Sequence, residues 1–236
     1  MFLTDINGLK GLSELFSQII KRNISGDALA WLQSKVTLVK SEEKAMQLNL
    51  TFSHIPKQTG KNNLQVEPQE SQQIQTLLPG FSLDEWSTDR LCRVWLLMQV
   101  DAGDKETYLK KINGLFSAAE MNEEVALYAA LPFYSYPEAW IARCENGIRS
   151  NIGTVLEAIM YHNPYPAKYL PEASWNQLVL KAFFTEKDVS KITGLYERVN
   201  PALADTLTDY VQERQAAHRT VAPEIYKLIE LTNQKI

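Results

Sequence analysis

The sequence predicts an all-α fold of about ten stacked antiparallel helices, arranged as an α-solenoid or a compact α-superhelix. Apolar residues recur at three- and four-residue spacing along most of the chain, as in amphipathic helices. No segment alternates apolar and polar residues between turn signals, as a half-buried strand would. With 236 residues, of which 45% are hydrophobic, the chain can form one sizeable core. We therefore expect a single domain over residues 1–236.

The N-terminal third is predicted to form three helices. In the first, which should end near Asn23, six apolar residues share one face: Leu9, Leu12, Leu15, Phe16, Ile19 and Ile20. Ser25 can cap a second helix that includes Val36. A third helix is expected from about Glu42 to Ile55 and should end at Pro56, because proline lacks a backbone donor. The polar loop 57–69 then offers an internal boundary, since it contains Gly60 and has no periodicity.

The rest of the chain repeats this pattern. After a short helix ending near residues 78–80, helices are expected over residues 84–100, 105–119, 123–131, 137–147, 151–162, 174–184, 201–217 and 223–231. Pro137, Pro201 and Pro223 stand at or near first helical positions, where the missing N–H costs nothing. The segment 90–100 is apolar almost all round, with Arg90, Arg93 and Gln99 as the polar exceptions, which predicts a central helix covered on most sides.

Composition excludes several classes of protein. The net charge is −4 and the basic residues are scattered, so nucleic acid is not an expected partner. Cys92 and Cys144 lie in apolar helical segments, without a C-x-x-C pair, which predicts buried, reduced thiols in a cytoplasmic protein and neither a metal site nor a cofactor. Residues 1–20 do not resemble a signal peptide. No stretch approaches the roughly 20 apolar residues of a transmembrane segment.

No motif of a common enzyme class is present, so no catalytic residue is predicted. The chain lacks a phosphate-binding loop, a dinucleotide fingerprint, a His-Glu-x-x-His pair and a nucleophile elbow. His162 is the one histidine near Glu157 and Arg149 and could act as a general base, but no nucleophile accompanies it. A histidine at a helix end more often caps carbonyl groups or faces solvent.

The segment 149–181 contains most of the candidate binding residues. Arg149, Gly153 and Glu157 fall at i, i+4 and i+8 of a predicted helix, so that a glycine gap separates a cation from a carboxylate. Either a ligand approaches the backbone at Gly153, or a neighbouring helix packs there and pairs with the two charges. We predict that Arg149 and Glu157 both point into the protein, with partners from the 175–181 helix or the 163–166 loop.

Two X-Pro steps follow, at residues 163–166, and favour an extended, rigid connection lined by aromatic residues. This connection could form the lip of an apolar ligand site, or it could plug the end of a helical layer. The candidate binding residues are Arg149, Asn151, Glu157, His162, Asn163, Tyr165, Trp175, Asn176 and Lys181.

Three C-terminal runs carry a resemblance to a known family. They are Asn163-Pro164-Tyr165-Pro166, then the segment 175–182 (WNQLVLKA), then the segment 210–219 (YVQERQAAHR) followed by Pro223-Glu224. Together they resemble the C-terminal half of the EboA family over residues 149–226. Family members often have Ala-His-Glu-Arg-Trp where this chain has Val211-Gln212-Glu213-Arg214-Gln215.

This resemblance implies a setting in bacterial secondary metabolism, because EboA proteins accompany a UbiA-like membrane prenyltransferase and several soluble enzymes. It implies a non-enzymatic helical adaptor or ligand carrier that handles a metabolite precursor, with a small apolar metabolite as its ligand. Such a protein would be cytoplasmic and associated with the periphery of the inner membrane. The alternative is a metal-free enzyme acting on an isoprenoid-like or aromatic metabolite, which would require a closed apolar cavity among the helices.

Overall fold

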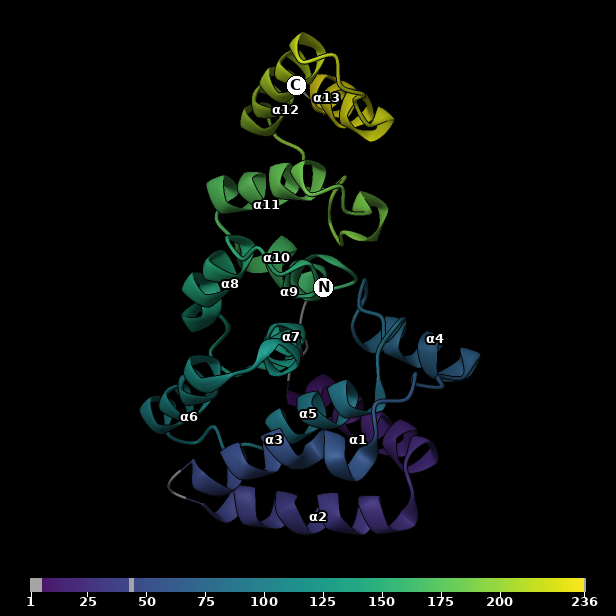
Figure 1. Cartoon of the computed structure of the whole chain (residues 1–236), viewed down its shortest axis with the longest axis vertical. Coiled ribbons are helices and arrows are strands. Elements are labelled where there is room, and N and C mark those ends of the chain that lie inside the picture. Colours follow the sequence, from purple (N-terminus) through teal and green to yellow (C-terminus); the bar gives the residue numbers. More distant parts are fainter. Residues whose placement is uncertain (1–5, 43–44, 236) are drawn as a thin grey trace.

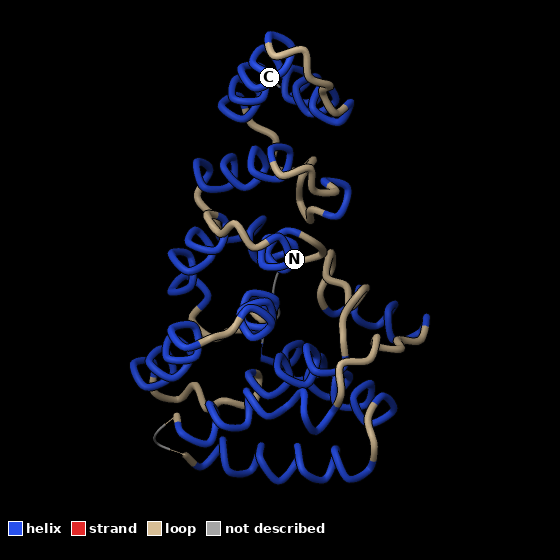
Figure 2. The backbone as a smooth tube through the Cα atoms, viewed as in Figure 1, coloured by secondary structure: helices blue, strands red, loops and turns tan. Residues whose placement is uncertain are grey.

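The computed structural model describes residues 6–42 and 45–235. Within these ranges the chain forms α-helices and short 3-10 turns without strands, which confirms the all-α prediction (Figure 2). The first part of the predicted 42–55 helix falls on residues 43–44, outside the described residues.

Thirteen α-helices occur in the described ranges: α1 Ile6–Asn23, α2 Gly26–Ser41, α3 Met46–Thr59, α4 Pro68–Leu77, α5 Thr88–Leu97, α6 Lys105–Ala118, α7 Met121–Ala129, α8 Ile141–Ile148, α9 Gly153–Met160, α10 Pro164–Tyr169, α11 Glu172–Phe184, α12 Pro201–Ala216 and α13 Pro223–Lys235.

The helices are stacked in successive layers. Figure 1 shows this order, from α2 at one end of the molecule to α12 and α13 at the other. Helix α5 contacts α1, α3 and α7, helix α7 contacts α9, and α11 contacts both α8 and α12. One cluster of buried apolar side chains extends through these layers from Leu12 to Leu228. No helix of the described residues is long and apolar enough to cross a membrane.

The segment expected as an internal boundary is tied to the helices around it. Helix α3 continues to Thr59, and residues 61–67 are extended. Asn23, at the end of α1, accepts a hydrogen bond from the Gln65 backbone N–H at 2.7 Å and donates one to its carbonyl at 2.9 Å. Arg22 also donates to both carboxylate oxygens of Glu70 in α4, at 2.6 and 2.5 Å, and these bonds lower the pKa of Glu70.

Helix α3 passes through Pro56 instead of ending there, so this part of the sequence prediction was wrong. A proline has no N–H to donate to the carbonyl four residues earlier, which here belongs to Phe52. The Nε of Arg93 donates to this Phe52 carbonyl at 3.1 Å. A side chain of α5 therefore supplies the donor that the proline lacks.

Arg93 also connects α5 to α7. Its side chain is 3% exposed, and its guanidinium bonds the Asp89 carboxylate at 2.8 Å and lies 3.9 Å from a carboxylate oxygen of Glu123 in α7. Burial lowers the pKa of Arg93, while both carboxylates favour its charged form. Residues 91–97 are buried throughout, so α5 is the central helix that the sequence predicted, although it spans only Thr88–Leu97.

Two further local predictions differ from the structure. The helix expected from residue 151 begins at Gly153, because the Ser150 hydroxyl accepts a hydrogen bond from the Ile152 backbone N–H at 3.1 Å and so extends the turn after α8. The 163–166 segment is not an extended loop, because it starts the short helix α10. Pro164 occupies a first helical position there, and the Asn163 side chain accepts the Tyr165 N–H.

We expect Arg93→Leu to lower the free energy of unfolding by about 3 to 5 kcal/mol, because Asp89 would remain buried without its cation. Urea denaturation of this variant measures the loss. Lys110→Leu removes an exposed cation in α6 and serves as the control, with an expected change within about 0.5 kcal/mol.

Pro56→Ala tests the bond to the Phe52 carbonyl separately. In the Arg93→Leu background the new alanine N–H can donate to the Phe52 carbonyl, which has lost its donor. The change in the free energy of unfolding caused by Pro56→Ala should therefore be about 1 kcal/mol more stabilising there than in the wild type. Equal effects of Pro56→Ala in the two backgrounds would contradict this account of the Arg93 side chain.

Candidate functional site

A cleft of about 460 Å³ lies at the centre of the stack, between the start of α5, helix α7 and helix α9. Four separate segments contribute to it, including the 82–87 turn before α5 and Lys191 after α11. We call it the Arg90 cleft, and its lining is Ser82, Asp84, Glu85, Trp86, Ser87, Arg90, Asn122, Val125, Thr154, Glu157, Tyr161, His162 and Lys191.

Arg90 lines this cleft without an ion pair among the described residues. Its guanidinium lies over the Trp86 ring, 4.2 Å from the ring centre. Its Nε is buried and has no acceptor among the described residues. Burial lowers the pKa of Arg90 to about 10, with Glu157 and Asp89 partly opposing the shift, so the side chain is charged at neutral pH. An anion in the cleft would place a counterion beside this guanidinium.

Two carboxylates of the lining are already paired with lysines. Lys191, in the lining, bonds Glu85 at 3.0 Å, and Lys187, outside it, bonds Glu157 at 2.6 Å. The Glu157 side chain is 40% exposed, so its ion pair is partly solvated. Asp84 is exposed to solvent. These pairings leave the Arg90 guanidinium as the charge most in need of a counterion.

Two residues of the cleft have left-handed backbone conformations. Glu85 has a φ of 62° and His162 a φ of 49°, although neither is glycine. The His162 N–H donates to the Lys191 carbonyl at 2.8 Å, which holds the end of α9 against the 189–192 turn. Strained backbone of this kind is often found at binding sites, where the surrounding structure enforces it.

The structure separates the sequence-predicted residues into three groups. Glu157 and His162 line the Arg90 cleft. A second group lies elsewhere at the surface, where the Lys181 Nζ is 3.5 Å from the Asn151 side-chain oxygen. Arg149 is exposed and bonds Asn146, in the preceding helix α8.

The expected ridge of Arg149, Gly153 and Glu157 does not exist, because the turn at residues 149–152 places the two charges on different elements. The prediction that both side chains point into the protein was wrong for Arg149, which is exposed. The predicted source of the partner was wrong for Glu157, which pairs with Lys187. The gap at Gly153 is filled by this lysine, since a Cβ on Gly153 would lie 3.2 Å from the Lys187 Nζ.

The third group supports the fold. Asn163 is 3% exposed and donates to the Ala158 carbonyl at 2.9 Å, and the Tyr165 hydroxyl donates to the Pro137 carbonyl at 2.6 Å. Trp175 is fully buried, and the Arg198 guanidinium lies over its ring, 4.8 Å from the ring centre. The amide of Asn176 exchanges two hydrogen bonds with that of Asn200, at 3.1 and 2.9 Å. Apart from the Trp175 Nε1, which is buried without an acceptor among the described residues, the polar groups of these side chains are engaged in structural contacts.

Sequence reasoning missed Arg90, Trp86 and Lys191 as members of a site. Arg90 was recognised only as a polar exception in an apolar helix. That exception was a usable signal, because a charged residue in a helix covered on most sides needs a partner.

The polar groups of the lining can be assessed one by one. The Ser87 hydroxyl donates to Asp89 at 2.6 Å, and the Ser82 hydroxyl accepts from the Asp84 N–H at 3.0 Å, so both are engaged in local contacts. In the described part of the chain, no group of three or more His, Cys, Asp or Glu side chains could hold a metal ion. An anionic group beside Arg90, with an apolar body along Trp86 and Tyr161, fits the residues present.

Substitution of Asn163 should lower the free energy of unfolding more than substitution of Glu157. Asn163→Ala removes a buried cap and should lower the free energy of unfolding by about 2 kcal/mol. Glu157→Gln weakens a partly solvated pair and should cost less than about 1 kcal/mol. Chemical denaturation measures both, and a larger loss for Glu157→Gln would contradict their assignment to the cleft and to the fold.

The comparisons with known proteins identify a family. Residues 12–230 match the family model described as metabolite traffic protein EboA. Neither the curated proteins nor the solved structures contain a significant match. The matched region includes all of the Arg90 cleft as well as the C-terminal runs that carried the resemblance. The chain therefore belongs to the EboA family of metabolite traffic proteins.

Proposed function

We propose that this chain is a non-enzymatic, ligand-binding adaptor in the traffic of a bacterial secondary-metabolite precursor, and that the Arg90 cleft holds the ligand. Family membership supports a role in metabolite traffic. The observation that carries the proposal is the Arg90 guanidinium, which lines the cleft and whose Nε has no acceptor among the described residues. A ligand with a carboxylate or phosphate group would pair with the side of this guanidinium that faces the cleft.

The apolar part of such a ligand would lie along the aromatic side of the cleft. Trp86 and Val125 line the cleft beside Arg90, and Tyr161 lines it at the end of α9. Its volume of about 460 Å³ is within the range of small-molecule sites. The proposed ligand is therefore amphipathic, with one anionic end.

The enzymatic alternative has less support. It requires a closed apolar cavity around an isoprenoid-like or aromatic substrate, whereas the Arg90 cleft is lined mainly by polar and charged residues. The helical layers on either side are filled by a continuous apolar cluster. Binding without chemistry is the simpler function for this geometry.

The adaptor part of the proposal concerns partners. The expected partners are a UbiA-like membrane prenyltransferase and the soluble enzymes that accompany it, with the adaptor in the cytoplasm at the periphery of the inner membrane. Pull-down with each of these proteins, combined with a metabolite-binding screen, tests the proposal. If the chain binds none of these proteins and no metabolite, the proposal is refuted.

Ligand binding is tested with small probes of defined charge. Benzoate and inorganic phosphate should bind in equilibrium dialysis, whereas benzamide, which is neutral, should bind at least about tenfold more weakly, because it cannot neutralise Arg90. Arg90→Met should remove the preference for the anions.

Arg219→Met is the matched control, because Arg219 is exposed at the end of the α12–α13 hairpin, far along the chain from the cleft. This variant should bind benzoate like the wild type. Equal binding of benzoate by Arg90→Met and the wild type would exclude Arg90 as the anion site.

A further inference from the structure

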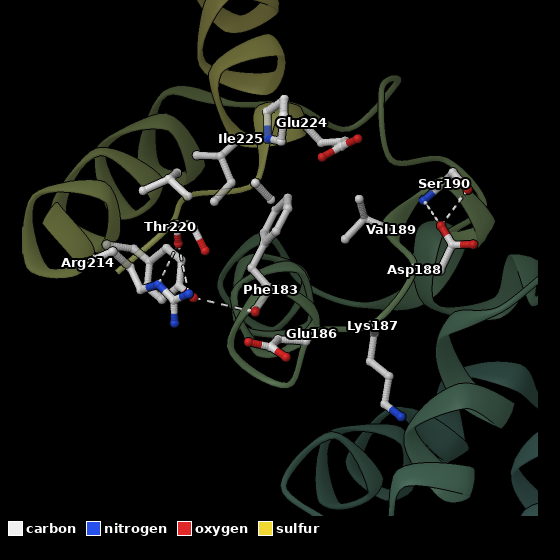
Figure 3. A pocket seen from close by; sticks show the side chains of 14 residues that line it. Phe183, Glu186, Lys187, Asp188, Val189, Ser190, Arg214, Thr220, Glu224 and Ile225 are labelled. Carbon is white, nitrogen blue, oxygen red and sulfur yellow. Dashed lines mark hydrogen bonds between the residues drawn. The ribbon is translucent and has the colours of Figure 1, made fainter. Parts of the chain in front are cut away.

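A second cleft lies at the C-terminal end of the stack, where the end of α11 meets the α12–α13 hairpin (Figure 3). Its volume is about 590 Å³. Phe183, Val189 and Ile225 form an apolar floor, and Glu186, Asp188 and Glu224 supply carboxylates around it. We call this site the C-terminal groove.

The charge that faces this groove is negative. Glu186, Asp188 and Glu224 are exposed, and the Ser190 hydroxyl lowers the pKa of Asp188 by donating to it at 2.5 Å. Three carboxylates therefore outnumber Arg214, the basic residue of the lining whose bonds stay within the groove. Arg214 donates to the Thr220 carbonyl through two nitrogens, at 3.0 and 2.8 Å, and Figure 3 shows the Lys187 side chain directed away from the groove, where it bonds Glu157.

Glu186 stands where a glycine would be more favourable. Helix α11 ends in a Schellman motif, in which the Lys187 N–H donates to the Ala182 carbonyl at 2.8 Å and the Glu186 N–H to the Phe183 carbonyl at 3.2 Å. This motif requires a left-handed residue, and Glu186 has a φ of 54°. A side chain in that conformation costs stability, yet it places a carboxylate at the rim of the groove.

Two large apolar side chains are exposed on the helices that form the groove. Phe184 is 68% exposed and Tyr226 is 48% exposed, and each directly follows a residue of the apolar floor. Exposed aromatic side chains are enriched at protein interfaces. A small ligand that filled the groove would leave them uncovered.

We propose that the C-terminal groove binds a segment of a protein partner in which basic side chains flank an apolar one. The apolar residue would enter between Phe183, Val189 and Ile225, and the basic residues would meet the three carboxylates. An anionic lipid surface is excluded by the same charges, which it would repel. The proposal names the chemistry of the partner and so rests on the adaptor part of the proposed function, but not on the Arg90 cleft.

The test uses short synthetic peptides and the whole chain. A labelled peptide with lysines on both sides of a leucine pair should bind in fluorescence anisotropy. Replacing its lysines by glutamates, or its leucines by serines, should abolish binding, since each removes one of the two complementary features. Phosphatidylserine vesicles should not bind.

Glu186→Gly separates binding from folding. The variant should melt at a higher temperature, because glycine suits the left-handed position, and should bind the lysine–leucine peptide about three- to tenfold more weakly. Glu224→Lys should also weaken binding. Asp205→Lys makes the same charge change at an exposed position of α12 outside the groove and should leave binding unchanged.

Several results would overturn the inference. It is overturned if the lysine–leucine peptide does not bind at all, if Glu186→Gly binds it as tightly as the wild type, or if Asp205→Lys weakens its binding as much as Glu224→Lys does. Binding of phosphatidylserine vesicles that depends on the groove would also overturn it, as would a dimer of this chain that Glu186→Gly dissociates. Benzoate binding in the same preparations distinguishes this failure from that of the proposed ligand site. If benzoate still depends on Arg90, only the partner chemistry is wrong.

Discussion

The hydrogen bond from Arg93 to the Phe52 carbonyl is the constraint on which the middle of the stack depends. Pro56 removes the helical donor that this carbonyl would otherwise receive, and a buried carbonyl without a donor is costly. Arg93 supplies the donor at 3.1 Å, and Asp89 and Glu123 compensate its own buried charge. A proline in α3, an arginine in α5 and a glutamate in α7 are therefore parts of one interaction, which positions three helices.

The same helix carries a second arginine, Arg90, whose side chain has fewer hydrogen-bond acceptors around it. Arg90 and Arg93 are three residues apart on α5, yet Arg93 has carboxylate and carbonyl acceptors, whereas the Arg90 Nε has none among the described residues. The Arg93 network fixes α5 against α3 and α7, and this in turn holds Arg90 and Trp86 at the mouth of the cleft. A cation held in place by a rigid helix loses little freedom on binding, which suits the anionic ligand that we propose for the cleft.

Sequence periodicity predicted most helices because each buries a regular apolar face, as α1 does with Leu12, Phe16 and Ile19. It was less accurate at helix ends, where side-chain bonds decide the boundary. The Ser150 turn delays the start of α9 to Gly153, and the Asn163 cap starts α10 where an extended loop was predicted. The candidate site was only partly predictable for a different reason. Glu157 and His162 lie in the segment with the richest motifs, but Arg90 and Lys191 reach the same cleft from positions far away in the sequence.

The two clefts share one short segment of chain, which gives the adaptor proposal a physical basis. Residues 186–191 follow the Schellman motif of α11, and Lys187 crosses from the C-terminal groove to bond Glu157 at the Arg90 cleft. The Asp188 N–H donates to the Tyr161 hydroxyl at 2.8 Å, and the Lys191 carbonyl accepts the His162 N–H. A partner that moved the backbone at Glu186 or Asp188 would disturb these contacts at the Arg90 cleft. Left-handed residues stand on both sides of this connection, at Glu186 and at His162, so the backbone there is already strained. Coupling between the two sites requires only that this segment have two arrangements of similar free energy.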